Sequence, residues 1–332
     1  MSMTPREIIK RNLTLGGPER IGMNFDGDRM NDFCGAGIGP SETWKQRRWV
    51  EGNAEYYDDE WGNVWFRIQG MSQVGEIHDA AIKDWADLKE YQLPDMANPK
   101  RFEEARKIFS EETQRYRFGG LPGFTFAVCR YLRKMEIYFQ DLLLERDHID
   151  ELHDRVASLL EAIIRQLADA GADGIFFCED WGTQQRLLVS PAMWRDIFKP
   201  LFKRLCGTAH QCGLDVIMHS CGYIWEIIDD LAEVGVNALQ FDQPGLYGLA
   251  RLADKLQTLN VCLYSPVDIQ RIMPTGDRQR IEAEAEKMLT LFAGDRGGLI
   301  AKNYPDLHGI GVKPEWDQWA YDVFKASCLK SP

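Results

Sequence analysis

Residues 215–222 read Asp-Val-Ile-Met-His-Ser-Cys-Gly, a short apolar run that ends in an imidazole, a hydroxyl and a thiol. Such a run is typical of a strand buried on both faces of a parallel sheet. A helical pattern precedes it at 191–212, beginning with Ser190 as N-cap and Pro191, and another follows at 224–234. The segment therefore predicts a strand between two helices, with polar side chains at the carboxyl end of the strand.

The same alternation of strand and helix recurs along the chain. Further strands are predicted at 20–25, 118–122, 174–178, 237–241, 260–264 and 298–302. Further helices are predicted at 100–115, 134–170, 247–258 and 277–294. Alternation of this kind builds parallel βαβ units. Seven strands are one fewer than a closed barrel contains, and an open doubly wound sheet is the alternative. Polar residues follow strand after strand, and no G-x-G-x-x-G motif follows the first. We therefore predict an α/β protein with a (β/α)8 TIM barrel.

The first hundred residues have a different pattern. Thr4-Pro-Arg-Glu7 predicts a capped helix over 4–13, and residues 26–95 read as irregular apart from a hairpin over 56–66 that turns at Gly62-Asn63. We expect a single domain over 1–332, with an N-terminal helical and hairpin elaboration, including the first strand, in 1–100 and the main barrel in 101–332. The aromatic residues of 44–66 would form either a lid over the core or the face of a homodimer.

Composition limits the classes of partner. The chain has 332 residues, with 39 basic and 51 acidic ones and a net charge of −12. This charge argues against binding to nucleic acid or to an anionic membrane surface. The N-terminus lacks the apolar region of a signal peptide, and the eight cysteines show no compact spacing and are expected to be mostly small core residues. We therefore expect a cytoplasmic protein with reduced thiols.

His219 and Cys221 are the first candidate metal ligands. Side chains two residues apart in an extended chain point the same way, and zinc accepts both nitrogen and sulfur ligands. A catalytic zinc site has a third protein ligand. Glu179 and Asp180 follow the neighbouring strand and are predicted as catalytic carboxylates, with Glu179 also as a ligand.

Asp306 and His308 follow the last strand and are further candidate ligands. With Gly311 they fit the D-x-H-x-x-G motif of cobalamin-binding modules. Such a module is a separate domain, and too few residues follow Gly311 to form one. We interpret the motif as coincidence and keep the two side chains only as possible ligands at the barrel mouth.

Several motifs taken together carry a family resemblance. They are Ala170-Gly-Ala-Asp173, Ser190-Pro-Ala-Met193 and His219-Ser-Cys-Gly222, supported by Asp58-Asp-Glu-Trp-Gly-Asn-Val-Trp65. With these motifs the chain resembles the uroporphyrinogen decarboxylase superfamily and, within it, the corrinoid-related (cobalamin-dependent) methyltransferase branch. The resemblance extends over nearly the whole chain. It implies a (β/α)8 barrel and a corrinoid supplied by a partner protein.

Two departures from the family pattern limit what the resemblance implies. True decarboxylases resemble one another in an arginine-containing motif, Met-Arg-Gln-Ala-Gly-Arg. At that place this chain has the acidic stretch Asp26-Gly-Asp-Arg-Met-Asn-Asp-Phe-Cys-Gly35. Its negative charge would repel a polycarboxylate. The thiol-directed methyltransferases have a second cysteine after the last strand, which is missing here. Asp306 is nearest to its place. A site of His219 and Cys221 with Glu179 and either Asp306 or His308 is one interpretation, and loss of the metal is the other.

The leading hypothesis is therefore a zinc-assisted methyltransferase. It would move a methyl group between a small methylated substrate or thiol and a corrinoid on a separate protein. Residues predicted to orient or contact the substrate are Gln184, Gln240, Asp242 and Tyr223. One alternative is a metal-free decarboxylase or lyase, which would need arginines at the mouth, with Arg29, Arg130 and Arg186 as candidates. The other is a non-catalytic partner of a corrinoid protein, or a metal-binding protein.

Overall fold

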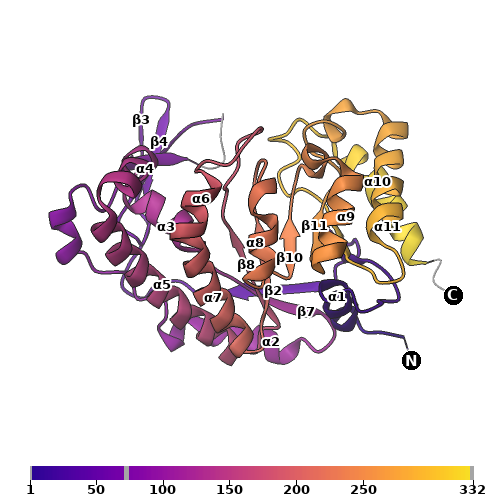
Figure 1. Ribbon diagram of the computed structural model, residues 1–332, viewed down its shortest axis with the longest axis horizontal. Helices are drawn as coiled ribbons and strands as arrows, with labels where there is room; N and C mark the ends of the chain where they lie inside the picture. The colour runs from indigo at the N-terminus through magenta and orange to yellow at the C-terminus, as the bar shows by residue number, and fades with distance from the viewer. Residues whose placement is uncertain (1, 71–74, 330–332) are drawn as a thin grey trace.

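A computed structural model of the chain describes residues 2–70 and 75–329. Its main sheet has eight parallel strands in the spatial order β1-β12-β11-β10-β9-β8-β7-β2, rolled into a nearly closed barrel (Figure 1). The strands are β1 (Gly22–Asn24), β2 (Phe33–Gly37), β7 (Tyr116–Gly120), β8 (Gly174–Cys178), β9 (Asp215–His219), β10 (Ala238–Gln240), β11 (Cys262–Ser265) and β12 (Leu299–Lys302). The predicted (β/α)8 architecture is confirmed.

The eighth strand, β2, lies in the stretch 26–95 that we predicted to be irregular, and that prediction is wrong at this point. Its sequence, Phe-Cys-Gly-Ala-Gly, lacks the bulky apolar run of the other strands. A Cβ on Gly35 would lie 3.1 Å from the Phe118 ring of the neighbouring strand β7. The small residues are needed for close packing, and they also hide the strand from pattern analysis.

Asp32 links the two edge strands of this sheet. Its backbone N–H donates to the carbonyl of Met23 at 2.8 Å, and its carboxylate accepts from Met23 N at 2.9 Å. The same carboxylate pairs with Arg20, whose Nη1 lies 2.6 Å from Oδ2. We refer to these contacts as the β1–β2 seam.

Helices surround the barrel, and most lie where the periodicity predicted them (Figure 1). They are α2 (Glu103–Glu111), α3 (Thr125–Leu132), α4 (Met135–Leu144), α5 (Arg146–Asp169), α7 (Lys199–Gln211), α8 (Ile228–Glu233), α9 (Leu249–Leu259), α10 (Arg278–Phe292) and α11 (Pro314–Cys328).

The predicted helix over 134–170 is two helices, because the backbone leaves the helical region at Glu145. The predicted helix over 191–212 consists of α6 (Pro191–Met193), a π-helical segment (Trp194–Phe198) and α7. Short 3₁₀ helices are η1 (Trp85–Lys89), η2 (Pro99–Phe102), η4 (Trp225–Ile227), η5 (Pro244–Tyr247) and η6 (Met273–Thr275).

Helix α1 (Pro5–Leu13) packs against one end of the barrel interior. It begins with the predicted capping box, in which Thr4 accepts from Glu7 N and Glu7 accepts from Thr4 N. Ile9 and Leu13 of this helix belong to the inner core, which contains Phe33, Tyr116, Ile217, Ala238, Cys262, Tyr264 and Ile300. The alternate residues of the strands, such as Phe177 and Met218, point outward to the helices. Strand alternation therefore decides which side chains enter the barrel.

The predicted hairpin is confirmed as part of a separate four-stranded antiparallel sheet. Its strands are β3 (Arg48–Glu51), β4 (Ala54–Asp58), β5 (Val64–Ile68) and β6 (Glu76–Asp79). The turn between β4 and β5 is closed by Asp59, whose carbonyl accepts from Gly62 N at 3.1 Å. In Figure 1 the β3–β4 end of this sheet lies beside α4.

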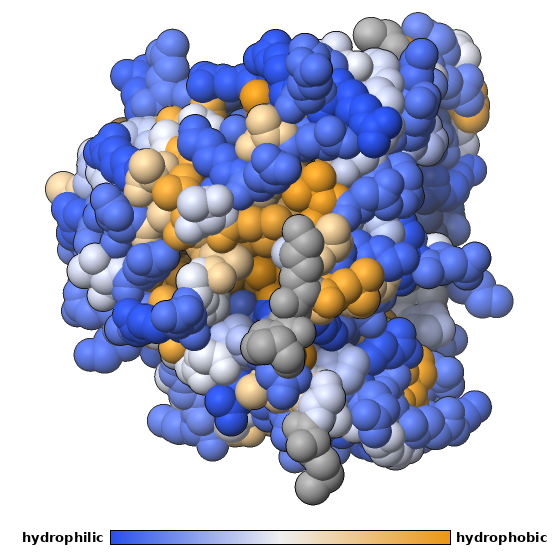
Figure 2. Space-filling model, turned by 90° about the vertical axis from the view of Figure 1, so that its right-hand side faces the viewer, coloured by the Kyte–Doolittle hydropathy of each residue, from blue (hydrophilic) through white to orange (hydrophobic). Residues whose placement is uncertain are grey.

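Among the residues that the structure describes, no helix is both long and apolar enough to cross a bilayer. Figure 2 shows the side of the molecule that lies to the right in Figure 1, a hydrophilic surface with a central hydrophobic patch. Mixed surfaces of this kind are ordinary, since a protein of this size cannot bury all its apolar atoms.

Candidate metal centre

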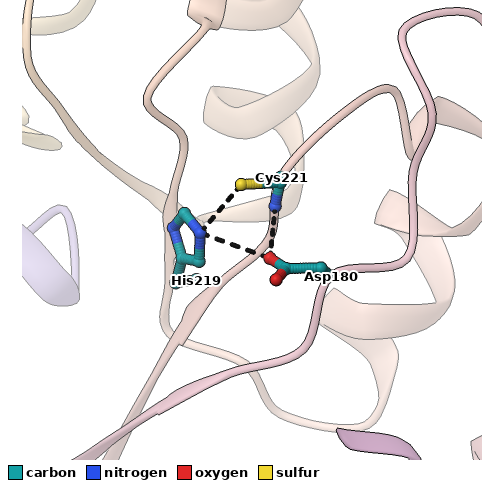
Figure 3. Close-up of side chains that lie close together, drawn as sticks. All are labelled: Asp180, His219 and Cys221. Carbon is teal, nitrogen blue, oxygen red and sulfur yellow. Dashed lines mark hydrogen bonds and ion pairs between the residues drawn. The ribbon is translucent and has the colours of Figure 1, made fainter. Parts of the chain in front are cut away.

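Asp180, His219 and Cys221 converge at the carboxyl ends of β8 and β9 (Figure 3). His219 Nε2 lies 3.3 Å from Cys221 Sγ and 3.4 Å from an Asp180 carboxylate oxygen. The three possible ligand atoms all lie within 4.8 Å of one another. We call these residues the N/S/O cluster. The predicted convergence of His219 and Cys221 is therefore seen, and Asp180 is the third member.

Two loops hold the cluster together through backbone contacts. Asp180 accepts a hydrogen bond from Cys221 N at 2.9 Å, and Gly182 N donates to the carbonyl of Cys221 at 3.2 Å. Gly222 adopts a φ of +75°, and a Cβ there would overlap the backbone of Gly182. The glycines let the loop after β8 and the loop after β9 pack closely enough to bring an aspartate beside the thiol.

The charges of the cluster reinforce one another. Burial opposes ionisation of Asp180, but the hydrogen bond and charge of His219 outweigh it and hold the pKa of Asp180 below its ordinary value. Burial likewise opposes the imidazolium form of His219, but hydrogen bonds with Asp180 and Cys221 raise its pKa well above the ordinary range. Arg130 adds a further positive charge, with Nη2 at 3.7 Å from Asp180 Oδ2.

The N/S/O cluster fits a zinc ion in two respects. Imidazole nitrogen, thiolate sulfur and carboxylate oxygen are the ligand types that zinc takes, and three protein ligands are typical of a catalytic site. Zinc–ligand distances of about 2.0–2.3 Å in a tetrahedral arrangement place ligand atoms roughly 3.3–3.7 Å apart. His219 lies at 3.3 and 3.4 Å from its two neighbours, which matches this spacing.

The structure does not bring Glu179 into this cluster. Alternation along β8 turns its side chain outward, where Oε1 accepts from Phe124 N at 2.9 Å and Ala127 N at 2.8 Å at the start of α3. Oε2 has no hydrogen-bond partner among the described residues. Burial raises the pKa of Glu179 to about 8. The geometry assigns Glu179 to the packing of α3 on β8, not to the metal centre.

Asp306 and His308 also lie outside the cluster. Asp306 Oδ1 accepts from Gly309 N at 2.9 Å, so the carboxylate closes the turn after β12. The His308 side chain is exposed to solvent. Neither belongs to the group of ligand atoms that converge. The D-x-H-x-x-G pattern here is a surface turn.

The four predicted substrate contacts are distributed differently. Gln240 and Asp242 are buried and bonded to each other, with Gln240 Nε2 donating to Asp242 Oδ1 at 2.7 Å. Gln184 is exposed and donates to Gln243 at 3.0 Å. Tyr223 stacks on Tyr247 with ring centroids 5.3 Å apart.

Two further residues lie at the mouth to which the sequence assigned no role in the site. Cys178 is exposed and lies opposite His219 in the register of β8 and β9, although the cysteines are mostly expected in the core. Lys302 ends β12 and reaches Asp242 Oδ1 with its Nζ at 3.3 Å. The signal that could have found them was the period of two: Cys178 shares the face of Asp180, and Lys302 that of inward-facing Ile300.

An aromatic cavity adjoins the cluster. It has a volume of about 640 Å³ and is lined by Trp65 and Ile77 of the small sheet and by Arg130, Tyr131 and Phe139 of α3 and α4. Arg130 lines this cavity and also contacts Asp180. The aromatic residues of 44–66 thus contribute a wall beside the metal centre.

Fold and cluster together define a (β/α)8 barrel protein with a metal-type site at the carboxyl ends of its strands. A model of the uroporphyrinogen decarboxylase (URO-D) family matches residues 70–303, which is more than half of the chain. The chain therefore belongs to the uroporphyrinogen decarboxylase family.

Two solved structures are similar to this chain, and the first of them supports the fold. A methyltransferase from Methanosarcina mazei superimposes with a TM-score of 0.58 at 16% sequence identity, covering 78% of this chain and 72% of the methyltransferase. A D-psicose 3-epimerase from Clostridium cellulolyticum H10 gives a TM-score of 0.41 at 10% identity, covering 73% of this chain and 86% of the epimerase. No curated protein sequence gives a significant match. At 16% identity the methyltransferase shows a shared fold only.

Proposed function

We propose that this protein is a zinc-assisted methyltransferase that moves a methyl group between a small methylated substrate or thiol and a corrinoid carried by a separate protein. The observation that carries the proposal is the convergence of His219, Cys221 and Asp180 at the barrel mouth. Family membership and the methyltransferase among the similar structures support it.

In this proposal His219 Nε2, Cys221 Sγ and Asp180 would hold the ion. Bound zinc would act as a Lewis acid that activates a thiol or polarises the oxygen or sulfur that carries the methyl group. Arg130 positions Asp180, because its guanidinium lies beside the carboxylate and stacks on Phe126 and Tyr131. The aromatic cavity beside Arg130 would take the apolar part of the substrate.

The charges at the mouth favour a small substrate of low charge. Arg130 faces Asp180, and Lys302 faces Asp242, so each cation already has a carboxylate beside it. A substrate with many carboxylates would find little uncompensated positive charge here. The corrinoid protein, the homodimer and the cytoplasmic location are predictions that accompany the proposal.

The decarboxylase alternative gains no support from its candidate arginines. Arg29 pairs with Asp317 of α11 at 2.6 Å, Arg130 is engaged with Asp180, and Arg186 is exposed. A decarboxylase for a polycarboxylate needs cations whose charge is available to the substrate.

Elemental analysis of purified protein tests the proposal. We expect stoichiometric zinc in the wild type and in the control Cys212→Ser, whose thiol lies at the C-cap of α7. His219→Ala and Cys221→Ser should lose most of the metal, since each removes one ligand of three. The zinc-loaded wild type should then demethylate methylcobalamin with a member of a panel of thiols. Zinc content equal in all four proteins would overturn the proposed site. Zinc binding without transfer would instead leave a metal-binding protein.

A further inference from the structure

A chain of hydrogen bonds leads from the far side of the mouth to His219. Lys302 Nζ lies 3.3 Å from Asp242 Oδ1, Gln240 Nε2 donates to the same oxygen at 2.7 Å, and Gln240 Oε1 lies 2.6 Å from His219 Nδ1. Strands β9, β10 and β12 and the loop after β10 supply these residues and His219. We call Lys302, Asp242 and Gln240 the positioning chain.

We infer that the positioning chain holds a proton on His219 Nδ1, so that Nε2, which faces Cys221 and Asp180, is the nitrogen left available to a metal ion. The inference rests on the proposed metal site and assigns Gln240, Asp242 and Lys302 as positioning residues for it. It replaces the substrate-binding role that the sequence suggested for Gln240 and Asp242.

The direction of each hydrogen bond follows from the chemistry of the groups. An ammonium group only donates, and a carboxylate only accepts. Asp242 therefore requires the NH₂ end of the Gln240 amide, which turns the carbonyl oxygen of that amide toward His219. A carbonyl oxygen only accepts, so His219 must donate from Nδ1. The reverse orientation would place two acceptors 2.7 Å apart at Asp242.

Because these residues are buried, water does not compete for the hydrogen bonds and cannot reverse their direction. Gln240 is 3% exposed and Asp242 is 9% exposed. Asp242 Oδ2 also lies 3.9 Å from His219 Nδ1, where its charge favours a proton on that nitrogen. Outer partners of this kind fix the tautomer and the orientation of metal-ligating histidines in proteins.

Asp242→Leu is the variant that separates this inference from a general structural role. It removes the oxygen that accepts from both Lys302 and Gln240. The Gln240 amide would then be free to turn over and present its NH₂ to His219. In that orientation His219 Nδ1 becomes an acceptor, and its proton moves to Nε2, the ligating nitrogen.

The conservative variant Asp242→Asn should keep the original order. Its amide oxygen can take the place of Asp242 Oδ1, which accepts from both Lys302 and Gln240. The carbonyl oxygen of Gln240 then still faces His219. The matched control is Asp230→Asn, another buried aspartate, which pairs with Arg195 and Lys199 on the outside of the barrel.

Two measurements report on these variants. In the metal-free protein, ¹⁵N spectra of labelled histidine at a pH where the imidazole is neutral give the tautomer, with His219→Gln to assign the signal. Competition with a chelator gives the zinc affinity. We expect the Nδ1–H tautomer in the wild type, the control and Asp242→Asn, and a mixture of both tautomers in Asp242→Leu. The zinc affinity of Asp242→Leu should fall by about 10–100-fold, the usual effect of losing an outer partner, and that of Asp242→Asn should stay near the wild-type value.

The outcomes distinguish the two proposals. The expected tautomers without zinc binding in the wild type would overturn the proposed function and leave the positioning chain standing. An unchanged tautomer in Asp242→Leu, or a zinc affinity of Asp242→Asn no better than that of Asp242→Leu, would overturn the positioning chain even if zinc binds. If Asp242→Leu does not fold, Gln240→Leu serves instead, because it removes the acceptor and should populate both tautomers and weaken zinc binding.

Discussion

Glu179 and Asp180 are neighbours in the sequence with different surroundings in the structure. Asp180 points into the mouth and contacts His219, whereas Glu179 is fully buried under α3 and binds two backbone N–H groups there. The sequence could not choose between them, because both follow the same strand. The period of two in β8 decides it: Phe176, Cys178 and Asp180 share the inner face, and Glu179 does not.

The burial of Glu179 predicts a pH-dependent stability. In the unfolded chain its carboxyl ionises near the ordinary value, while the folded protein holds the proton until about pH 8. Between these values the folded state binds more protons, so the free energy of unfolding falls as pH rises. Glu179→Gln keeps the acceptor for Phe124 and Ala127 and cannot ionise. Urea unfolding should show the variant gaining a few kcal/mol relative to the wild type between pH 5 and pH 9, since each pKa unit corresponds to about 1.4 kcal/mol.

Glu151→Gln is the matched control for this measurement, because Glu151 is exposed on α5. Its unfolding curve should keep the pH dependence of the wild type. Parallel pH profiles for Glu179→Gln and the wild type would contradict the assignment of a protonated, buried carboxyl.

At the scale of elements, two loops decide whether a metal centre forms. Each leaves a strand at the mouth, and they pack backbone against backbone at Gly182 and Gly222. His219 and Cys221 would still converge without this contact, since they are two residues apart on one chain. Asp180 comes from another strand and depends on it.

Gly222→Ala should therefore damage the metal centre although it removes no ligand. Gly213→Ala is a matched control, because Gly213 has the same φ of +75° but a Cβ added there would meet no atom within 4 Å. Both variants should lose about 1–2 kcal/mol of stability from the left-handed backbone. Only Gly222→Ala should lose more than this and bind zinc more weakly, as measured by unfolding and by chelator competition. Equal zinc affinities would show that loop contact does not position Asp180.

Strand β2, which the sequence pattern did not predict, is also explained by its neighbouring elements. Helices such as α9 and α10 have regular apolar periodicity and were predicted close to their actual bounds. Strand β2 instead carries two glycines and lies in a loop-rich stretch, so its strand character comes from pairing with β7. Local sequence preference is weak for such a strand, because its stability comes from its neighbours.

At the scale of the whole molecule, the barrel closes at the β1–β2 seam. The two strands there are the ends of the strand order and do not pair as a regular ladder. Within the described residues the two strands meet through Asp32 and an isolated antiparallel bridge between Asn24 and Asn31. Asp32 is almost fully buried and binds Arg20 and the Met23 N–H. The Asp32 carboxylate is therefore a main contact of this seam, beside the backbone bridge.

Asp32→Ala should cost about 3–5 kcal/mol of unfolding free energy, because it leaves Arg20 partly buried without its partner. The control is Asp150→Ala on α5, which removes an exposed pair with Arg146 and should cost about 0.3–0.5 kcal/mol. Urea unfolding of both variants at pH 7 checks the difference. A loss for Asp32→Ala no larger than that of the control would show that the barrel does not rely on this seam.

The sequence by itself determined the barrel class and the pairing of His219 with Cys221. Both follow from local periodicity: apolar runs that alternate with amphipathic helices, and two side chains on one face of one strand. Only the tertiary structure decided that Asp180 completes the cluster, that Cys178 lines the mouth, and that Lys302, Asp242 and Gln240 form one chain. These contacts join residues on different strands. Their meeting depends on strand register and on the closing of the sheet, which bring distant residues within hydrogen-bonding distance.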